Sequence, residues 1–264
     1  MEVHAHTHTP RKKWTHYFWE FLMLFLAVFC GFLAENQREH YVEKQRAKEL
    51  ARALYSELFD DSVAIANKIQ LRLGKENDID YLSSYFKDSS LTSLPREFYP
   101  IFTTGAYLVI IYQFEPKDGV LNQLRNSGSL RYFKRMALQK LFGDISVCIN
   151  DVRARNEQEF LYFSNPIKSF LTKHYDFAWL DQLRTEFNNR RLIDVINDFR
   201  HNKLDIDFRS KILNVSSFNS EEASNMILFY KQTLVSTRML AMNNYVNTNH
   251  SLLAELRNNF KTGK

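Results

Sequence analysis

The sequence contains few of the residues that interrupt helices or cross-link a chain. Its 264 residues include 7 glycines, 5 prolines and 2 cysteines. Scarce glycine and proline argue against turn-rich β architectures and favour long helices. Two cysteines cannot form a disulfide framework, so burial of apolar side chains must stabilise the fold.

The chain also lacks the short motifs that carry enzyme chemistry. It contains no HExxH, GxSxG, CxxC or glycine-rich phosphate loop. Asp60-Asp61 and Glu221-Glu222 are adjacent carboxylates, and adjacent helical residues point about 100° apart. Neither pair is therefore expected to form a catalytic dyad. We predict no catalytic residues, no enzyme activity and no cofactor.

Charge of one sign does not dominate the chain. The 35 basic and 30 acidic residues give a net charge of +5. Lys134-Arg135 and Arg190-Arg191 are isolated basic pairs, whereas a nucleic-acid-binding domain collects its basic residues on one face or along one helix. We therefore predict no nucleic-acid partner.

Histidines alternate with other residues in HAHTHT, at positions 4, 6 and 8. Imidazole is the commonest metal ligand, but alternating histidines in a tail have no fixed geometry, and no cysteine or carboxylate cluster completes a site. We predict no metal site. His174, His201 and His250 stand alone in helical sequence and are expected at the surface or at helix ends.

One long apolar run is present near the N-terminus. Tyr17 to Ala34 are 18 residues in which Glu20 is the only charged side chain. A helix of this length covers about 27 Å, close to the hydrocarbon thickness of a bilayer. Trp14, Tyr17 and Trp19 stand at its start, where amphipathic rings favour the membrane interface. We predict a transmembrane helix over residues 14–34, with the lipid bilayer as its surroundings.

The same segment has the general shape of a signal peptide, because the basic residues Arg11, Lys12 and Lys13 precede it. Cleavage after Ala34 would place Phe32 where a small residue is required. The run also continues into charged helical sequence without a break. We predict an uncleaved anchor.

The basic residues also predict the orientation of this anchor. Arg11, Lys12 and Lys13 precede the run, and acidic and basic residues are mixed beyond Ala34. Short cytoplasmic segments are enriched in Lys and Arg. We predict a cytoplasmic tail over residues 1–13 and a location in the bacterial inner membrane. Residues 35–264 would then form a periplasmic domain.

Small residues share one face of the predicted span. Ala27, Cys30, Gly31 and Ala34 are spaced i, i+3, i+4, i+7. Glu20 precedes Ala27 by seven positions and therefore lies on the same face. Such a face admits a second helix, and a carboxyl group can form hydrogen bonds across the contact. The alternative is that Glu20 reaches to the headgroups and the small residues have no role. Both interpretations remain open.

Beyond the span, helical periodicity predicts a stalk helix over residues 35–74. Its apolar stripe is Leu50, Leu54, Leu58, Ile65 and Ile69. Gly74 is expected to end it. The span and the stalk should form one continuous helix.

Further helices are predicted along the rest of the chain. The ranges are 78–86 with Asp78 as its cap, 118–128 with Asp118 at its start and Gly128 at its end, 130–163 ended by Pro166, 167–173, 177–188, 191–199 and 219–260. Cys148 lies on an apolar stripe and is expected to be buried. Asn219 and Glu222 have capping-box spacing. Residues 105–114 suit a buried helix or a hairpin edge, and residues 204–215 are ambiguous.

These elements predict an all-α fold. The transmembrane helix continues into the stalk helix, and three long and several short helices form an elongated, mainly antiparallel bundle.

Two stretches support a family resemblance. YFWEFLMLFLAVFCGFLAENQREHYVEKQRAKELARALYSEL (17–58) and FEPKDGVLNQLRNSGSLRYFKRMALQKLFGDI (114–145) resemble an uncharacterised bacterial family of single-span membrane proteins. Its members have a His-rich tail, a glutamate in the span, matched by Glu20, and a helical periplasmic domain. Leu124–Leu130 matches the family motif L-x-S-S-G-N-L, with Asn126 and Ser129 as departures. The resemblance covers about residues 11–150 and implies no ligand or reaction.

Two functions fit these observations. The first is an interaction or scaffold subunit of an envelope complex, with another membrane or envelope protein as partner or with self-association through the span. The second is a periplasmic ligand-sensing domain. Because the segment before the span is short, such a sensor would need a membrane partner to relay its signal. A large exposed apolar patch would favour protein binding, and a pocket with convergent polar groups would favour a ligand.

Overall fold

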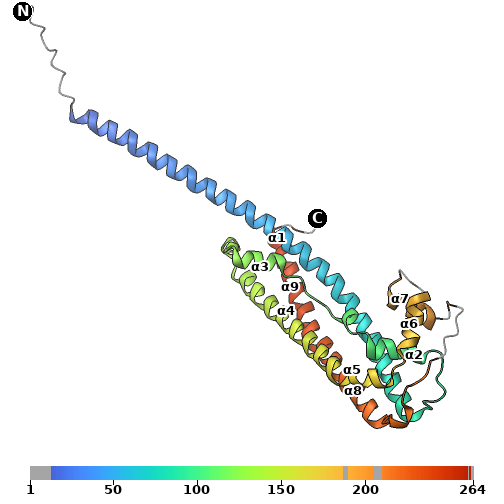
Figure 1. Ribbon diagram of the computed structural model, residues 1–264. Helices are drawn as coiled ribbons and strands as arrows, with labels where there is room; N and C mark the ends of the chain where they lie inside the picture. Colours follow the sequence, from blue (N-terminus) through green and yellow to red (C-terminus); the bar gives the residue numbers. More distant parts are fainter. Residues whose placement is uncertain (1–12, 187–189, 202, 205–209, 261, 263–264) are drawn as a thin grey trace, which may run out of the picture.

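The computed structural model describes residues 13–186, 190–201, 203–204, 210–260 and 262 (Figure 1). Within these ranges every regular element is a helix and no strand is present. The predicted all-α fold is confirmed.

A single helix, α1 (Trp14–Asp88), extends over 75 residues, which corresponds to about 112 Å. Its first part projects from the bundle as a free rod (Figure 1), and its first buried residue is Ala47. No proline lies between Pro10 and Pro95, so nothing in this stretch removes a backbone donor. The predicted continuity from the apolar segment into the bundle is confirmed.

The predicted end of this helix at Gly74 is wrong, because α1 continues to Asp88. A glycine inside a helix costs about 1 kcal/mol relative to alanine. Burial of Ile79, Leu82 and Phe86 in the next turns outweighs that cost. The separate helix predicted over 78–86 is therefore part of α1.

The two other long helices each contain a π-helical turn. The first joins α4 (Met136–Tyr162), η4 (Phe163–Ile167) and α5 (Lys168–His174), and the second joins α8 (Ser220–Ser236), η6 (Thr237–Met242) and α9 (Asn243–Phe260). Pro166 was expected to end the first helix, and that expectation is wrong. The π turn at η4 contains Pro166 and accommodates its missing donor.

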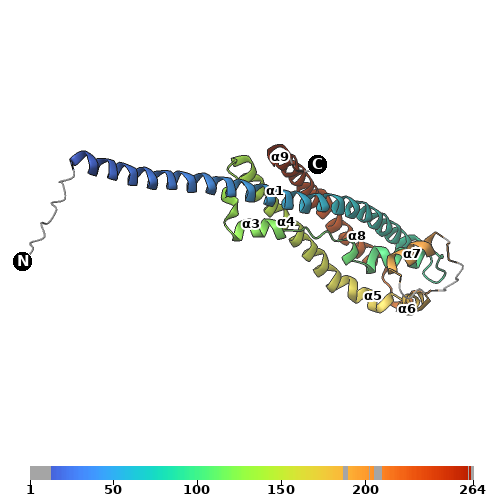
Figure 2. The same ribbon diagram turned by 90° about the horizontal axis from the view of Figure 1, so that it is seen from above.

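The second of these helices runs antiparallel to both of its neighbours. Against α1, Asn249 Nδ2 donates to Leu58 O at 3.0 Å and Lys231 Nζ lies 2.6 Å from Asp80. Against α4, Thr248 lies beside Cys148, and the hydroxyl of Tyr162 donates to a carbonyl of α8. It follows that α1 and α4 run in the same direction (Figures 1 and 2). The predicted antiparallel packing holds for the two contacts with α8–α9.

The connection between α1 and α4 carries the chain back along the bundle. It consists of α2 (Phe98–Phe102), η1 (Thr103–Tyr107), η2 (Ile110–Tyr112), an extended stretch, α3 (Gly119–Asn126) and η3 (Ser129–Tyr132). Residues 105–114 therefore form neither a hairpin edge nor a regular buried helix, but a π turn followed by a 3-10 turn. Gly128 ends α3 with φ +68°, as its sequence position predicts.

Two apolar cores lie at successive levels of the bundle. The core near the exposed rod contains Leu54, Phe142 and Leu252. The core at the opposite end is rich in aromatic rings, among them Phe86 and Tyr99. Short helices α6 (Phe177–Glu186) and α7 (Leu192–Arg200) and the 3-10 turn η5 (Val215–Ser217) cover that end, as predicted for α6 and α7. Part of the ambiguous 204–215 segment, residues 205–209, lies outside the described residues.

Candidate functional site

The predicted interfacial anchors lie at the start of α1. Trp14, Tyr17 and Trp19 occupy its first two turns and are exposed, and Lys13 immediately precedes the helix. Arg11 and Lys12 lie outside the described residues. In the described chain, α1 is the one helix long and apolar enough to cross a membrane, although a signal sequence has the same length and composition.

The small residues Ala27, Cys30, Gly31 and Ala34 are all exposed on α1. A Cβ added at Gly31 would meet no atom within 4 Å. No bulky side chain protrudes from this face of α1, so a second helix could approach the α1 backbone closely there.

The other side of the same segment carries phenyl rings. Phe21 stacks on Phe25 at 6.2 Å between ring centroids, and Phe25 stacks on Phe29 at 5.9 Å. Phe25 is two positions before Ala27 and therefore points about 160° away from it. The segment thus has one bulky aromatic face and one shallow face.

Glu20 contacts a residue of its own helix that sequence reasoning missed. His16 Nε2 lies 3.1 Å from Glu20 Oε1, one turn toward the start of α1. The i, i+4 spacing was visible in the sequence, and it brings the two side chains together. The carboxylate is therefore directed toward the start of α1, which is the direction that the headgroup interpretation of Glu20 expects. Lateral contact with a second helix stays a prediction.

A layer of buried charges separates the two apolar cores. Arg72 and Glu159 are 0% and 1% exposed and form a bidentate ion pair, with Nη1–Oε1 at 2.9 Å and Nη2–Oε2 at 2.7 Å. Arg72 also donates to Tyr112 O at 3.0 Å and to Leu234 O at 3.3 Å. One guanidinium therefore joins α1, the return segment, α4 and α8.

Lys75 lies one turn further along α1 and is fully buried. Its ammonium group donates to Leu108 O and stands over the rings of Tyr112 and Tyr230, 4.5 and 5.0 Å from their centroids. Burial is the main cause that lowers the pKa of Lys75, Glu159 and Asp78 oppose it and the charge of Arg72 adds to it, and together they bring the pKa to about 7.

Side chains of the long helices hold the backbone of the return segment. Lys68 donates to Ile111 O, Asn156 donates to Phe114 O and Arg153 donates to Pro116 O. The backbone N–H of Lys117 donates to Asp61 at 2.9 Å. An irregular segment inside a helical bundle needs such partners, because its peptide groups have none of their own.

The start of α3 is capped by another helix. Asp118 stands at the start of α3, as predicted, but its carboxylate does not cap the helix and accepts from Arg153 at 2.7 Å. The backbone N–H of Val120 donates to Glu57 of α1. Asp118 binds Arg153, and this contact holds the pKa of its carboxyl below the usual range.

Sequence reasoning missed the charged layer, although one signal was present. Ile65, Arg72 and Ile79 are seven residues apart on α1, so they share a face, and a charge on an apolar stripe indicates a buried partner. Its partner Glu159 is 87 positions away in the sequence, and no local pattern around Glu159 indicates that the two residues pair.

The remaining predicted residues have structural environments. Cys148 is buried, as expected. Asn219 accepts from the backbone N–H of Glu222 at 3.1 Å, which is the predicted cap of α8. His174 was expected at the surface or at a helix end. It is the last residue of α5 but is buried, with Nδ1 2.9 Å from Leu213 O. The described residues contain no group of three or more His, Cys, Asp or Glu placed to hold a metal. Positions 4, 6 and 8 lie outside them.

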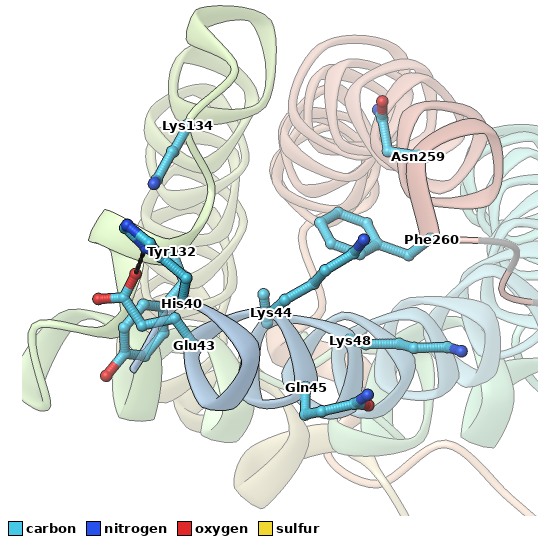
Figure 3. A pocket seen from close by; sticks show the side chains of 10 residues that line it. His40, Glu43, Lys44, Gln45, Lys48, Tyr132, Lys134, Asn259 and Phe260 are labelled. Atoms are coloured by element: carbon cyan, nitrogen blue, oxygen red, sulfur yellow. Dashed lines mark ion pairs between the residues drawn. The ribbon is translucent and has the colours of Figure 1, made fainter. Parts of the chain in front are cut away.

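Among the hollows that the described residues form, two bear on function. One, of about 470 Å³, lies beside the charged layer and is lined by residues including Lys75, Asp78, Thr104 and Arg200. The other, of about 680 Å³, lies where α1 enters the bundle (Figure 3). We name it the entry groove, lined by residues 40, 43–45, 47 and 48 of α1, by Tyr132 and Lys134, and by Asn259 and Phe260 of α9.

Comparisons with known proteins add no relative. No family model matches the chain, and neither a curated protein nor a solved structure is similar to it.

Proposed function

We propose that this chain is a single-pass membrane protein whose helical bundle serves as an interaction or scaffold subunit of an envelope complex. Residues 14–34 of α1 would form the anchor. The partner would be another membrane or envelope protein, or a second copy of the chain. Contact would be made through the shallow face of Glu20, Ala27, Cys30, Gly31 and Ala34.

The observation that carries the proposal is the difference between the two faces of this segment. Lipid solvates a face of phenyl rings well, whereas a face of small residues gains dispersion contacts only when a second helix approaches. Within the described chain the whole apolar window of α1 is unburied. We therefore expect lipid and a partner helix to cover this apolar segment.

The proposed location is the bacterial inner membrane, with the tail in the cytoplasm and the bundle in the periplasm. Lys13 of the described chain, with Arg11 and Lys12 before it, supports this orientation through the enrichment of basic residues in short cytoplasmic segments. Resemblance to the single-span family supports the same topology.

A second candidate function is ligand sensing. The hollow beside the charged layer supports it, because Lys75, Asp78, Thr104 and Arg200 bring polar groups to one recess. α1 runs from this recess to the proposed anchor without interruption, so a small shift of the helix would reach the membrane. Such a sensor would pass its signal to a membrane partner.

The test is cross-linking in whole cells at native expression, followed by mild solubilisation and identification of co-purifying proteins. The double variant Ala27→Leu, Gly31→Leu fills the shallow face. Phe25→Leu, Phe32→Leu is its control, because both residues lie on the opposite side and the side chains stay apolar. We expect the first variant to lose the cross-linked partner and the control to keep it.

Equal cross-linking in both variants would contradict the role of this face. A chain that cross-links to nothing would contradict the scaffold function. Binding of a small molecule to the full-length protein, weakened by Thr104→Val, would then favour the sensor.

A further inference from the structure

The entry groove collects positive charge close to the proposed membrane surface. Lys44 and Lys48 line it from α1, and Lys134 lines it from the stretch before α4. Lys44 extends toward the ring of Phe260, while Lys134 stands on the opposite wall (Figure 3). Glu43 is the single carboxylate among the lining residues, and His40 lies 3.9 Å from it. The groove therefore has a net positive charge, and Tyr132 and Phe260 contribute aromatic rings to its lining.

The start of α4 adds to this field. Its N-cap residue is Arg135, no side chain caps it and no acidic residue occupies its first turn. By contrast, α8 begins with a capping bond from Asn219 and has Glu221 and Glu222 in its first turn. A helix N-terminus carries about half a positive charge and is stabilised by anions. At α4 the neighbouring side chains are Lys134 and Arg135. Arg135 is paired with Glu255 of α9 at 3.3 Å, so Lys134 is the basic side chain left to favour an external anion there.

The height of the groove suits a bilayer surface. Lys44 follows Ala34 by ten residues, which places it about 15 Å beyond the end of the span. The headgroup layer covers about 5–7 Å of that distance. Transmembrane helices tilt by about 20° on average, and a tilt toward the α4 side would bring the groove closer to the headgroups. A lysine side chain then closes most of the remaining gap.

Apolar groups also stand at this end of the bundle. Met136, the first residue of α4, is 84% exposed, and Tyr132 lines the groove. Basic residues next to an exposed apolar side chain and a tyrosine are typical of surfaces that contact the headgroup region.

We propose that the entry groove and the first turn of α4 bind the phosphate of an anionic lipid headgroup in the leaflet from which α1 emerges. Lys44, Lys48 and Lys134 neutralise the phosphate, and the free N–H groups of the first α4 turn donate to it. The bound lipid fixes the tilt of the bundle on the membrane. This inference rests on the membrane anchorage proposed above.

The test is hydrogen–deuterium exchange of the full-length protein in nanodiscs of zwitterionic phosphatidylcholine, with and without about one quarter phosphatidylglycerol. The first-turn amides of α4, residues 136–138, are the readout. Because anionic lipid would accept from these groups, we expect their exchange to slow by about tenfold or more in the anionic discs.

Matched variants assign the effect to the groove. Lys44→Gln, Lys48→Gln, Lys134→Gln should abolish the slowing. Lys87→Gln, Lys168→Gln, Lys173→Gln removes the same charge from exposed sites at the other end of the bundle and should preserve it. Far-UV circular dichroism of both triple variants checks that the helices remain.

Three results would overturn the inference. The amides could exchange equally in both discs, the two triple variants could behave alike, or inorganic phosphate could protect the amides in zwitterionic discs as well as lipid does. Rapid exchange over residues 17–34 in both discs would instead disprove the anchorage, and the lipid site with it.

Discussion

The two halves of α1 have the same secondary structure and opposite surroundings. From Trp14 to Arg46 nearly every side chain is exposed, whereas from Ala47 onward one stripe is buried, mainly under α8 and α9. In the first half the helix depends on its own backbone bonds and on its solvent. In the second half it is stabilised by packing, which is the usual source of helix stability in proteins.

One ion pair from each half of α1 illustrates the difference between exposed and buried surroundings. Arg38 and Glu35 in the exposed half are 73% and 68% exposed and 3.0 Å apart. Arg72 and Glu159 in the buried half are almost inaccessible. Similar distances therefore describe unlike interactions: water screens the first pair, whereas removing one partner of the second leaves a charge in a dry interior.

The largest expected contrast comes from proline. Ala51→Pro removes a backbone donor and clashes with the preceding turn within the packed half, so we expect a loss of more than about 3 kcal/mol of unfolding free energy. Gln37→Pro has the same local effect in the exposed half, where no packing is lost. Urea unfolding of the full-length protein in detergent, followed by the fluorescence of buried Trp179, measures both. Equal losses would contradict the division of α1.

Next in size is the buried ion pair. Arg72→Met should destabilise the bundle by about 3–5 kcal/mol, because Glu159 is left unpaired. Adding Glu159→Leu should restore part of the loss. Arg38→Met in the exposed half should produce no measurable change. The same urea titration decides; a double variant no more stable than Arg72→Met would show that the bonds to Tyr112 and Leu234 carry the effect.

The smallest expected effect is a pH dependence. The folded-state pKa of Lys75 is lowered to about 7 from 10.5, so the unfolded chain binds more protons between these values. Stability should therefore rise as pH increases, by about 2 kcal/mol between pH 7 and 9.

Lys75→Met should remove this rise. The buried tyrosines have raised pKa values, so their titration affects stability only above about pH 10, outside the range from pH 7 to 9. A wild-type protein whose stability is flat over the same range would show that Lys75 keeps its charge inside the bundle.

Periodicity alone predicted much of the fold. The continuous helix from the apolar segment, the three long helices and the short helices near Leu171 and Val195 follow from local patterns. The errors lie where distant residues decide. Gly74 and Pro166 are local breakers that burial and a π turn accommodate, and residues 105–114 take their shape from bonds to α1 and α4.

Some parts of the candidate site could be predicted from the sequence and others could not. The shallow face was visible in the sequence because Ala27, Cys30, Gly31 and Ala34 belong to one helix. The charged layer and the entry groove combine residues from three or more segments. No spacing within a single segment could reveal them.

The unbroken course of α1 makes the molecule a lever. Fifty-four residues separate Ala34 from Asp88, about 80 Å of helix in one direction. A change of about 10° in the tilt of the apolar segment, within the usual range for spans, would sweep the far end through about 14 Å. If the apolar segment is anchored in a membrane as proposed, whatever fixes the first turns of this helix therefore also sets how far from that membrane the aromatic end of the bundle stands.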